Sequence, residues 1–103
     1  LLRSVFEDID VLACPSTIAP PGQITPEQLR DPMGGEDDLK WGRFTVPFDF
    51  NGAPTISLPC GQNSDGLPLS LQFVGKHLSE VLLVRLGHAY EQATDWRNMR
   101  PPM

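Results

Sequence analysis

A cysteine flanked by proline and glycine is the first side chain in this sequence that could act as a nucleophile. Cys60 has no histidine near it in the sequence, so its thiol would be activated only if His77 or His88 approached it in the fold. A small residue within an apolar strand explains the same position without catalysis, because free cysteines are among the most buried residue types. We therefore expect Cys60 to be a structural strand residue.

A serine paired with a lysine is the second arrangement that could carry nucleophilic chemistry. Ser57 and Ser70 lie in strand-like segments, and Lys76 follows the second of these. Neither Lys76 nor Lys40, the other lysine, stands beside a Gly/Ser-rich loop whose backbone N–H groups could stabilise an oxyanion. The sequence therefore predicts no catalytic residue in this chain.

Composition argues against metal and nucleic-acid chemistry. Two cysteines and two histidines at these spacings match no zinc pattern, and we expect no metal and no cofactor. The net charge is −5, and no basic patch is interleaved with aromatic residues, so binding to nucleic acid is not expected. The acidic cluster Glu36-Asp37-Asp38 indicates a solvated loop, with attraction of a cationic substrate as the alternative.

Length and cysteine usage bound the organisation and the compartment. The 103 residues suffice for one small domain or for part of a larger one, and the start at Leu1 without an initiator Met indicates a cut through a longer protein. No apolar run reaches the roughly 18 residues of a membrane span. Cys14 and Cys60 are compatible with a disulfide or with free thiols, and two lone thiols favour the cytoplasm.

Short elements must hold these side chains, because eleven prolines interrupt the sequence. We expect the end of a helix over residues 1–9, a buried strand over 10–14 and a short helix over 25–30 within a loop-rich stretch. Trp41, Phe44 and Phe48 would share one side of a helix, but Pro47 interrupts it. Two short turns that meet near Thr45 are therefore expected.

An alternating pattern in the second half predicts a β-hairpin and then a helix. Residues 56–60 and 67–74 form the strands, and 62–66 join them. Pro59 lacks an N–H, so its strand is an edge or its ladder ends there. The helix should begin at the N-cap Ser79 and fade near Trp96, with Gly87 allowing close packing against a sheet. Its expected apolar stripe is Leu82, Leu83, Leu86, Ala89, Tyr90 and Ala93.

The stretch from Phe44 to Gly75 places its prolines and glycines too specifically for a generic hairpin. It resembles the C-terminal part of amidase-signature hydrolases, in which a T-x-P-F-N…G-x-P segment leads into S-L-P-C-G and then G-L-P-x-x-L-Q. The resemblance runs from about Asp10 to the end and is weakest in residues 18–40. The matching residues are Thr45, Pro47, Phe48, Gly52, Pro54, Ser57, Leu58, Pro59, Cys60, Gly61, Gly66, Leu67, Pro68, Leu71 and Gln72.

This resemblance implies an α/β fold, a large mixed β-sheet flanked by helices. Residues 1–103 would be a partial amidase domain without an internal boundary, namely its C-terminal portion with the last strands and a closing helix. The remainder of the domain would then be the partner of the exposed strand edges and apolar faces. A homodimer is one expected assembly of the parent protein.

The resemblance also implies hydrolysis of a carbon–nitrogen amide bond in a small-molecule substrate, through an acyl-enzyme. In this family a Ser–cis-Ser–Lys triad acts: one serine attacks the carbonyl, and the other serine and the lysine relay protons. We expect that triad in the missing N-terminal portion and expect the 103-residue chain alone to be inactive. Two alternatives stay open, the glutaminase-type subunit of an amidotransferase and a non-catalytic binding module or pseudoenzyme fragment.

Contact with substrate would come from the segment that ends at Asp49. This segment resembles the region where these enzymes shape the acyl or amine pocket, and Trp41 is the leading wall residue because it stands at a loop edge. Aromatic residues at this spacing more often belong to a core, which is the alternative for Trp41, Phe44 and Phe48. Thr45 matches a family landmark, although an N-cap role in the following turn is the favoured interpretation. Asp49 stands where the family commonly has Asn, so it can accept hydrogen bonds but not donate them. The pocket candidates are Trp41, Thr45, Phe48 and Asp49.

Overall fold

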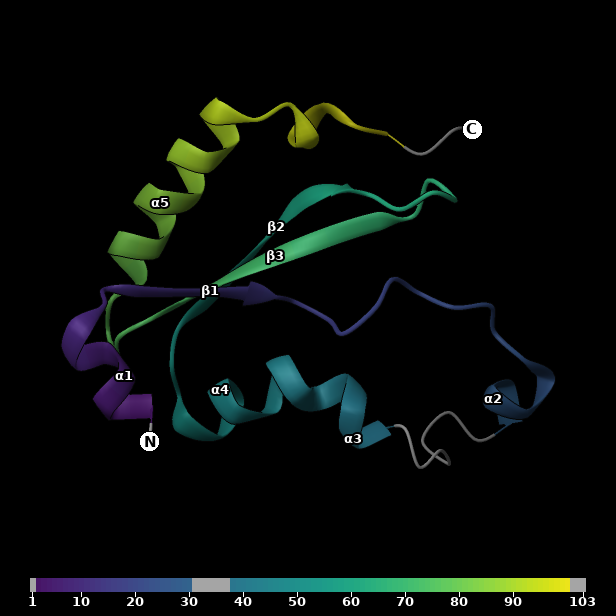
Figure 1. Ribbon diagram of the computed structural model, residues 1–103, viewed down its shortest axis with the longest axis horizontal. Helices are drawn as coiled ribbons and strands as arrows, with labels where there is room; N and C mark the ends of the chain where they lie inside the picture. The colour runs from purple at the N-terminus through teal and green to yellow at the C-terminus, as the bar shows by residue number, and fades with distance from the viewer. Residues whose placement is uncertain (1, 31–37, 101–103) are drawn as a thin grey trace.

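The computed structural model describes residues 2–30 and 38–100 and contains a three-stranded sheet with helices on both faces (Figure 1). Both strand pairs are antiparallel, and the order is β1-β3-β2. The strands are β1 (Val11–Pro15), β2 (Thr55–Gln62) and β3 (Pro68–Gly75). The helices are α1 (Leu2–Asp8), α2 (Pro26–Arg30), α3 (Asp38–Trp41), η1 (Gly42–Phe44), α4 (Val46–Asn51), α5 (Glu80–Ala93) and η2 (Trp96–Asn98).

The hairpin expected from the alternating pattern is confirmed as β2 and β3. Its loop is closed by Asn63, whose side-chain oxygen accepts hydrogen bonds from the backbone N–H groups of Asp65 at 3.0 Å and Leu67 at 2.8 Å. The register shifts between Pro59 and Gly61, which makes a bulge in β2. As expected for a strand with an internal proline, β2 lies at the edge of the sheet.

One face of the sheet packs against α5. A methyl group added at Gly87 would stand 2.9 Å from Ile56 Cδ1, so the expected close approach of this glycine to the sheet is confirmed. Leu83 is 2% exposed on the same helix, and the rings of Phe73 and Tyr90 meet edge to face with centroids 6.0 Å apart. The contact with the sheet is therefore dense along this side of α5.

The ends and the stripe of α5 differ from the sequence-based expectation. Ser79 occupies the N-cap position, but its hydroxyl donates to the carbonyl of Lys76 and does not cap the helix. The helix stops at Ala93, before Trp96, because Thr94 adopts an extended conformation. Leu82 is 40% exposed, so the buried stripe is narrower than the sequence suggested.

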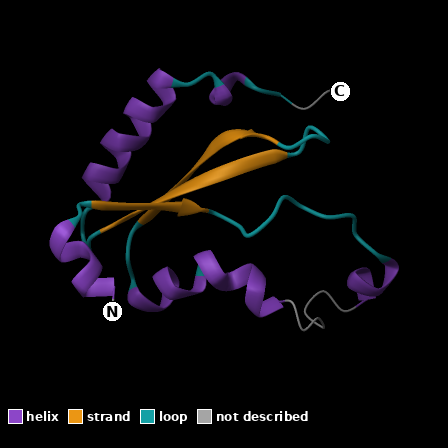
Figure 2. Ribbon diagram, viewed as in Figure 1, coloured by secondary structure: helices purple, strands orange, loops and turns teal. Residues whose placement is uncertain are grey.

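The opposite face of the sheet is covered by the chain from α3 to α4 (Figure 2). Phe48 of α4 is 7% exposed, and Val74 of β3 is fully buried. Gln72 stands two residues before Val74 in β3 and therefore lies on this same face, where it is 4% exposed. The expected break near Thr45 is confirmed, because this residue separates η1 from α4.

The buried core of the described residues is small. The Cα radius of gyration is 15.8 Å, whereas a compact domain of 100 residues has about 13 Å. Large apolar side chains remain at the surface, among them Phe50, Leu78 and Val81.

None of the helices in the described part of the chain is long and apolar enough to cross a membrane. Glu36 and Asp37 of the acidic cluster lie outside the described residues.

Gly75 gives a direct test of the packing between β3 and α5. A methyl group at this position would collide with Ser79 Oγ and stand 3.2 Å from Leu83 Cγ. Gly75→Ala should therefore lower the free energy of unfolding by about 1–3 kcal/mol, measured by denaturant titration of the full-length protein. Gly22→Ala is the control, because nothing lies within 4 Å of its added methyl group. Equal stability of the two variants would contradict the packing described here.

Candidate functional site

The segment from Trp41 to Asp49 is built around one proline. Pro47 stands in the first turn of α4, where its missing N–H costs nothing. The preceding 3-10 turn ends at Phe44, and Gly52 ends α4 in the left-handed conformation with φ of 66°. These signals fold the segment into two short turns that lie over the sheet.

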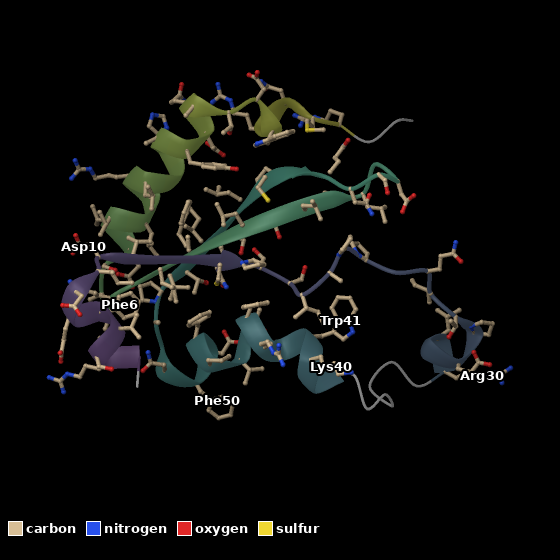
Figure 3. All side chains as sticks on the ribbon, in the orientation of Figure 1. Phe6, Asp10, Arg30, Lys40, Trp41 and Phe50 are labelled. Carbon is tan, nitrogen blue, oxygen red and sulfur yellow. The ribbon has the colours of Figure 1, made fainter. Side chains whose placement is uncertain are left out.

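The four candidate residues of this segment have different environments. Phe48 is buried, so its ring anchors the segment. Trp41 is 42% exposed, and Asp49 is exposed on α4. Figure 3 shows Phe50, 91% exposed, pointing away from the sheet. Thr45 is exposed as well, so Trp41, Thr45 and Asp49 have surface available for a ligand, and Phe48 is a support.

Thr45 stands at the N-cap position of α4, as the sequence suggested, but its side chain does not cap the helix. Its hydroxyl lies 3.5 Å from the carbonyl oxygen of Gly42, one turn earlier. Its own carbonyl accepts from the amides of Phe48 at 3.0 Å and Asp49 at 3.1 Å. Thr45 therefore joins the two turns mainly through its backbone.

A row of polar side chains crosses the sheet beneath this segment. Gln72 Nε2 donates to the Phe44 carbonyl oxygen at 2.7 Å and lies 3.5 Å from Cys14 Sγ. In the register of the sheet, Cys14 and Ser57 both stand opposite Gln72. The sequence indicated Gln72 only as a family landmark, and this role was missed. The sequence did contain a signal for this role, because Gln72 stands on the face of the predicted strand opposite its apolar face.

The serine–lysine pairing considered from the sequence is not formed. Ser16, 8% exposed, donates to Ser57 Oγ at 3.1 Å. Lys76 Nζ instead pairs with Asp10 Oδ1 at 3.2 Å on the surface. Ser57 therefore has the environment of a structural hydroxyl.

Cys60 lies at the bulge of β2 and is a free, half-buried thiol, as is Cys14. Burial raises the pKa of the neighbouring Tyr90 phenol above its ordinary 10.0, and Cys60 raises it further. The phenol therefore stays protonated near neutral pH and donates to the Pro59 carbonyl at 3.2 Å. His77 lies at the other end of β2, where its Nδ1 is 3.3 Å from the Gly52 carbonyl oxygen. No group of three potential metal ligands occurs within residues 2–30 and 38–100.

Two of the surface hollows beside the sheet are lined in part by Cys60 or His77. One, of about 460 Å³, is lined by both cysteines together with Thr17, Ile18 and Leu71. The other, of about 720 Å³, is lined by residues that include Phe6, Asn51 and His77. Neither is lined by the four pocket candidates, so the assignment of those four residues to a substrate pocket stays a prediction.

Comparison with known proteins gives a consistent result. The family model described as Amidase matches residues 2–84. The chain is 43% identical over 105 residues to the Mycobacterium tuberculosis protein named "Putative amidase AmiD", covering 99% of this chain and 21% of the relative. It is 44% identical over 103 residues to a glutamyl-tRNA(Gln) amidotransferase subunit of Halalkalibacterium halodurans, covering 98% and 20%.

A solved structure, 6-aminohexanoate cyclic dimer hydrolase complexed with substrate, has the same fold over this region. Its TM-score is 0.81 at 31% identity, over 96% of this chain and 22% of that one. The chain therefore belongs to the amidase family, and its sheet and helices are part of the α/β amidase-signature fold. It spans about a fifth of the length of these relatives.

The hydrogen bond between Ser16 and Ser57 gives a test of the structural role of the serines. Ser57→Ala would leave the buried Ser16 hydroxyl without this acceptor and should lower the free energy of unfolding by about 1–3 kcal/mol. Ser64→Ala, at an exposed position in the hairpin loop, should change it by less than about 0.5 kcal/mol. Thermal unfolding of the full-length protein measures both. Unchanged stability of Ser57→Ala would show that the bond is unimportant.

Proposed function

We propose that this chain is the C-terminal portion of an amidase that hydrolyses carbon–nitrogen bonds of a small-molecule amide. The observation that carries this proposal is the family match over residues 2–84, in a chain about a fifth as long as its relatives. Within the described residues, Ser57 bonds to Ser16 and Lys76 pairs with Asp10. This arrangement supports catalytic residues that lie elsewhere in the domain.

The proposed reaction is acyl transfer to a serine and then to water. The serine oxygen attacks the amide carbonyl, the carbon–nitrogen bond breaks, and the leaving amine takes a proton relayed by the second serine and the lysine. Water then hydrolyses the ester and releases the acid. The present chain would contribute the wall of the pocket and no group that forms a covalent bond.

Trp41 and Asp49 are the side chains that we assign to the substrate. The exposed part of the Trp41 ring would contact an apolar portion of the amide. Asp49 would accept hydrogen bonds from a donor on the substrate and would disfavour an anionic group nearby. Phe48 would hold these two residues in place from the buried side of the segment, and Thr45 would do so through the hydrogen bonds of its backbone carbonyl.

A second candidate function is that of the glutaminase-type subunit in a tRNA-dependent amidotransferase. The 44% identity to an amidotransferase subunit over 98% of this chain favours it. The similarity to AmiD is of the same size, so the identity within this chain does not choose between the two functions. The cytoplasmic location and the homodimer expected from the sequence stay predictions.

Residues 1–103 alone should not hydrolyse amides, whereas the full-length protein should. Release of ammonia or amine from a panel of aryl and alkyl amides and from glutamine measures both, with buffer as the background. Preference for glutamine in the presence of the other amidotransferase subunits would identify the second candidate. Turnover by residues 1–103 alone would overturn the location of the catalytic residues, and no turnover by the full-length protein would favour a non-catalytic role.

Trp41 and Phe50 give a matched pair for the substrate wall. Trp41→Ala should raise KM roughly tenfold with little change in kcat, because it removes binding that is equal in the ground and transition states. Phe50→Ala removes another exposed aromatic ring from the neighbouring α4, one that points away from the sheet, and should leave KM unchanged. Steady-state kinetics of the full-length protein separate the two. An equal effect of both substitutions would argue against a specific wall at Trp41.

A further inference from the structure

A buried glutamine on the central strand holds the backbone of the candidate segment. Gln72 is 4% exposed and lies in β3, which is paired with a strand on each side. Its side-chain nitrogen donates to the Phe44 carbonyl oxygen at 2.7 Å, across 28 residues of sequence. The partner is a backbone atom, so the bond constrains the path of the segment whatever side chain stands at position 44.

The Phe44 carbonyl needs this donor because the helix is interrupted here. In a continuous α-helix the amide of Phe48 would bond to this oxygen. Phe48 N donates instead to the Thr45 carbonyl at 3.0 Å, and Pro47 has no N–H to offer. A carbonyl that faces the sheet without a donor would cost free energy. Gln72 therefore supplies the bond that Pro47 and the change of helix type remove.

We infer that Gln72 is a positioning residue, which fixes the segment from Trp41 to Asp49 over the sheet and so sets where its exposed side chains stand. The inference rests on the proposed function only for its consequence in binding, since the hydrogen bond itself is independent of any substrate. β3 is a rigid support for this segment, because pairing with β1 and β2 restricts the motion of β3.

The competing explanation is that Phe48 alone holds the segment and Gln72 is merely a satisfied polar residue. The two explanations differ in what an apolar replacement does. Gln72→Met keeps the length of the side chain and removes the donor, so it releases the Phe44 carbonyl while the packing of Phe48 remains. Gln72→Glu keeps the shape and donates to that carbonyl only when the carboxyl group is protonated.

Hydrogen exchange of residues 42–52 in the full-length protein tests the inference, with residues 55–62 of β2 as the internal reference. Rates are compared with the unsubstituted protein at the same pH, over roughly pH 5 to 9, where a buried carboxyl group with a raised pKa titrates. Gln72→Met should exchange about five- to tenfold faster in residues 42–52 at every pH. Gln72→Glu should match the unsubstituted protein in acid and exchange faster in alkali.

The neighbouring Cys14 Sγ lies 3.5 Å from Gln72 Nε2 and is present in both variants, so any effect of Cys14 on exchange is shared by the two variants. A pH response shared by Gln72→Met and Gln72→Glu would therefore overturn the inference. So would normal exchange of residues 42–52 in folded Gln72→Met. If Gln72→Met does not fold, the pH dependence of Gln72→Glu decides alone.

Kinetics then separate this inference from the proposed function. Gln72→Met should raise KM by a factor similar to that for Trp41→Ala and leave kcat nearly unchanged. Fast exchange in Gln72→Met, together with an unchanged KM in both Gln72→Met and Trp41→Ala, would support Gln72 as a positioning residue. The same result would overturn the pocket role of the segment. A raised KM in Trp41→Ala, with normal exchange in Gln72→Met, would do the reverse.

Discussion

The pairing of β3 with a strand on each side is the constraint on which the rest of this structure depends. β3 pairs along its length with β2 and over its second half with β1. Its alternating side chains divide the molecule: Phe73 meets Tyr90 of α5 on one face, and Gln72 meets the Phe44 carbonyl on the other. Both helical layers therefore contact the same strand. The site on one side is therefore positioned by the same strand that contributes to the core on the other.

Local signals in the sequence were sufficient to predict the elements near this strand. The alternation over 67–74 indicated β3, Pro47 indicated the break at Thr45, and Gly87 indicated a close approach to the sheet. The first two features depend on residues that are neighbours in the chain, where steric rules and backbone hydrogen bonding decide the outcome. Gly87 was informative for another reason, because a glycine is costly within a helix unless close packing requires it. The family resemblance rested on the prolines and glycines between Phe44 and Gly75, and the comparisons confirm it.

Interactions between residues far apart in the sequence could not be predicted from such local signals. The bond from Gln72 to Phe44 and that from Ser16 to Ser57 depend on strand order and register, which no local pattern specifies. The sequence also did not indicate that the Thr45 hydroxyl turns back toward Gly42, because a threonine before a helix is more often a cap. The exposed side of α5 shows the same limit, since burial depends on the packed neighbours and not on the apolar stripe alone.

Prolines on both outer strands have a consequence for how this sheet can grow. The Ser16 amide donates inward to the Ser70 carbonyl, so by alternation the nitrogen of Pro15 faces the outer edge of β1, where it has no hydrogen to offer. Pro59 interrupts the other outer strand, β2, beside its bulge. A strand that adds to either edge would find a continuous ladder only along Val11–Cys14 or Thr55–Leu58. The two prolines therefore limit edge-to-edge association between copies while leaving one end of each edge open for a specific neighbour.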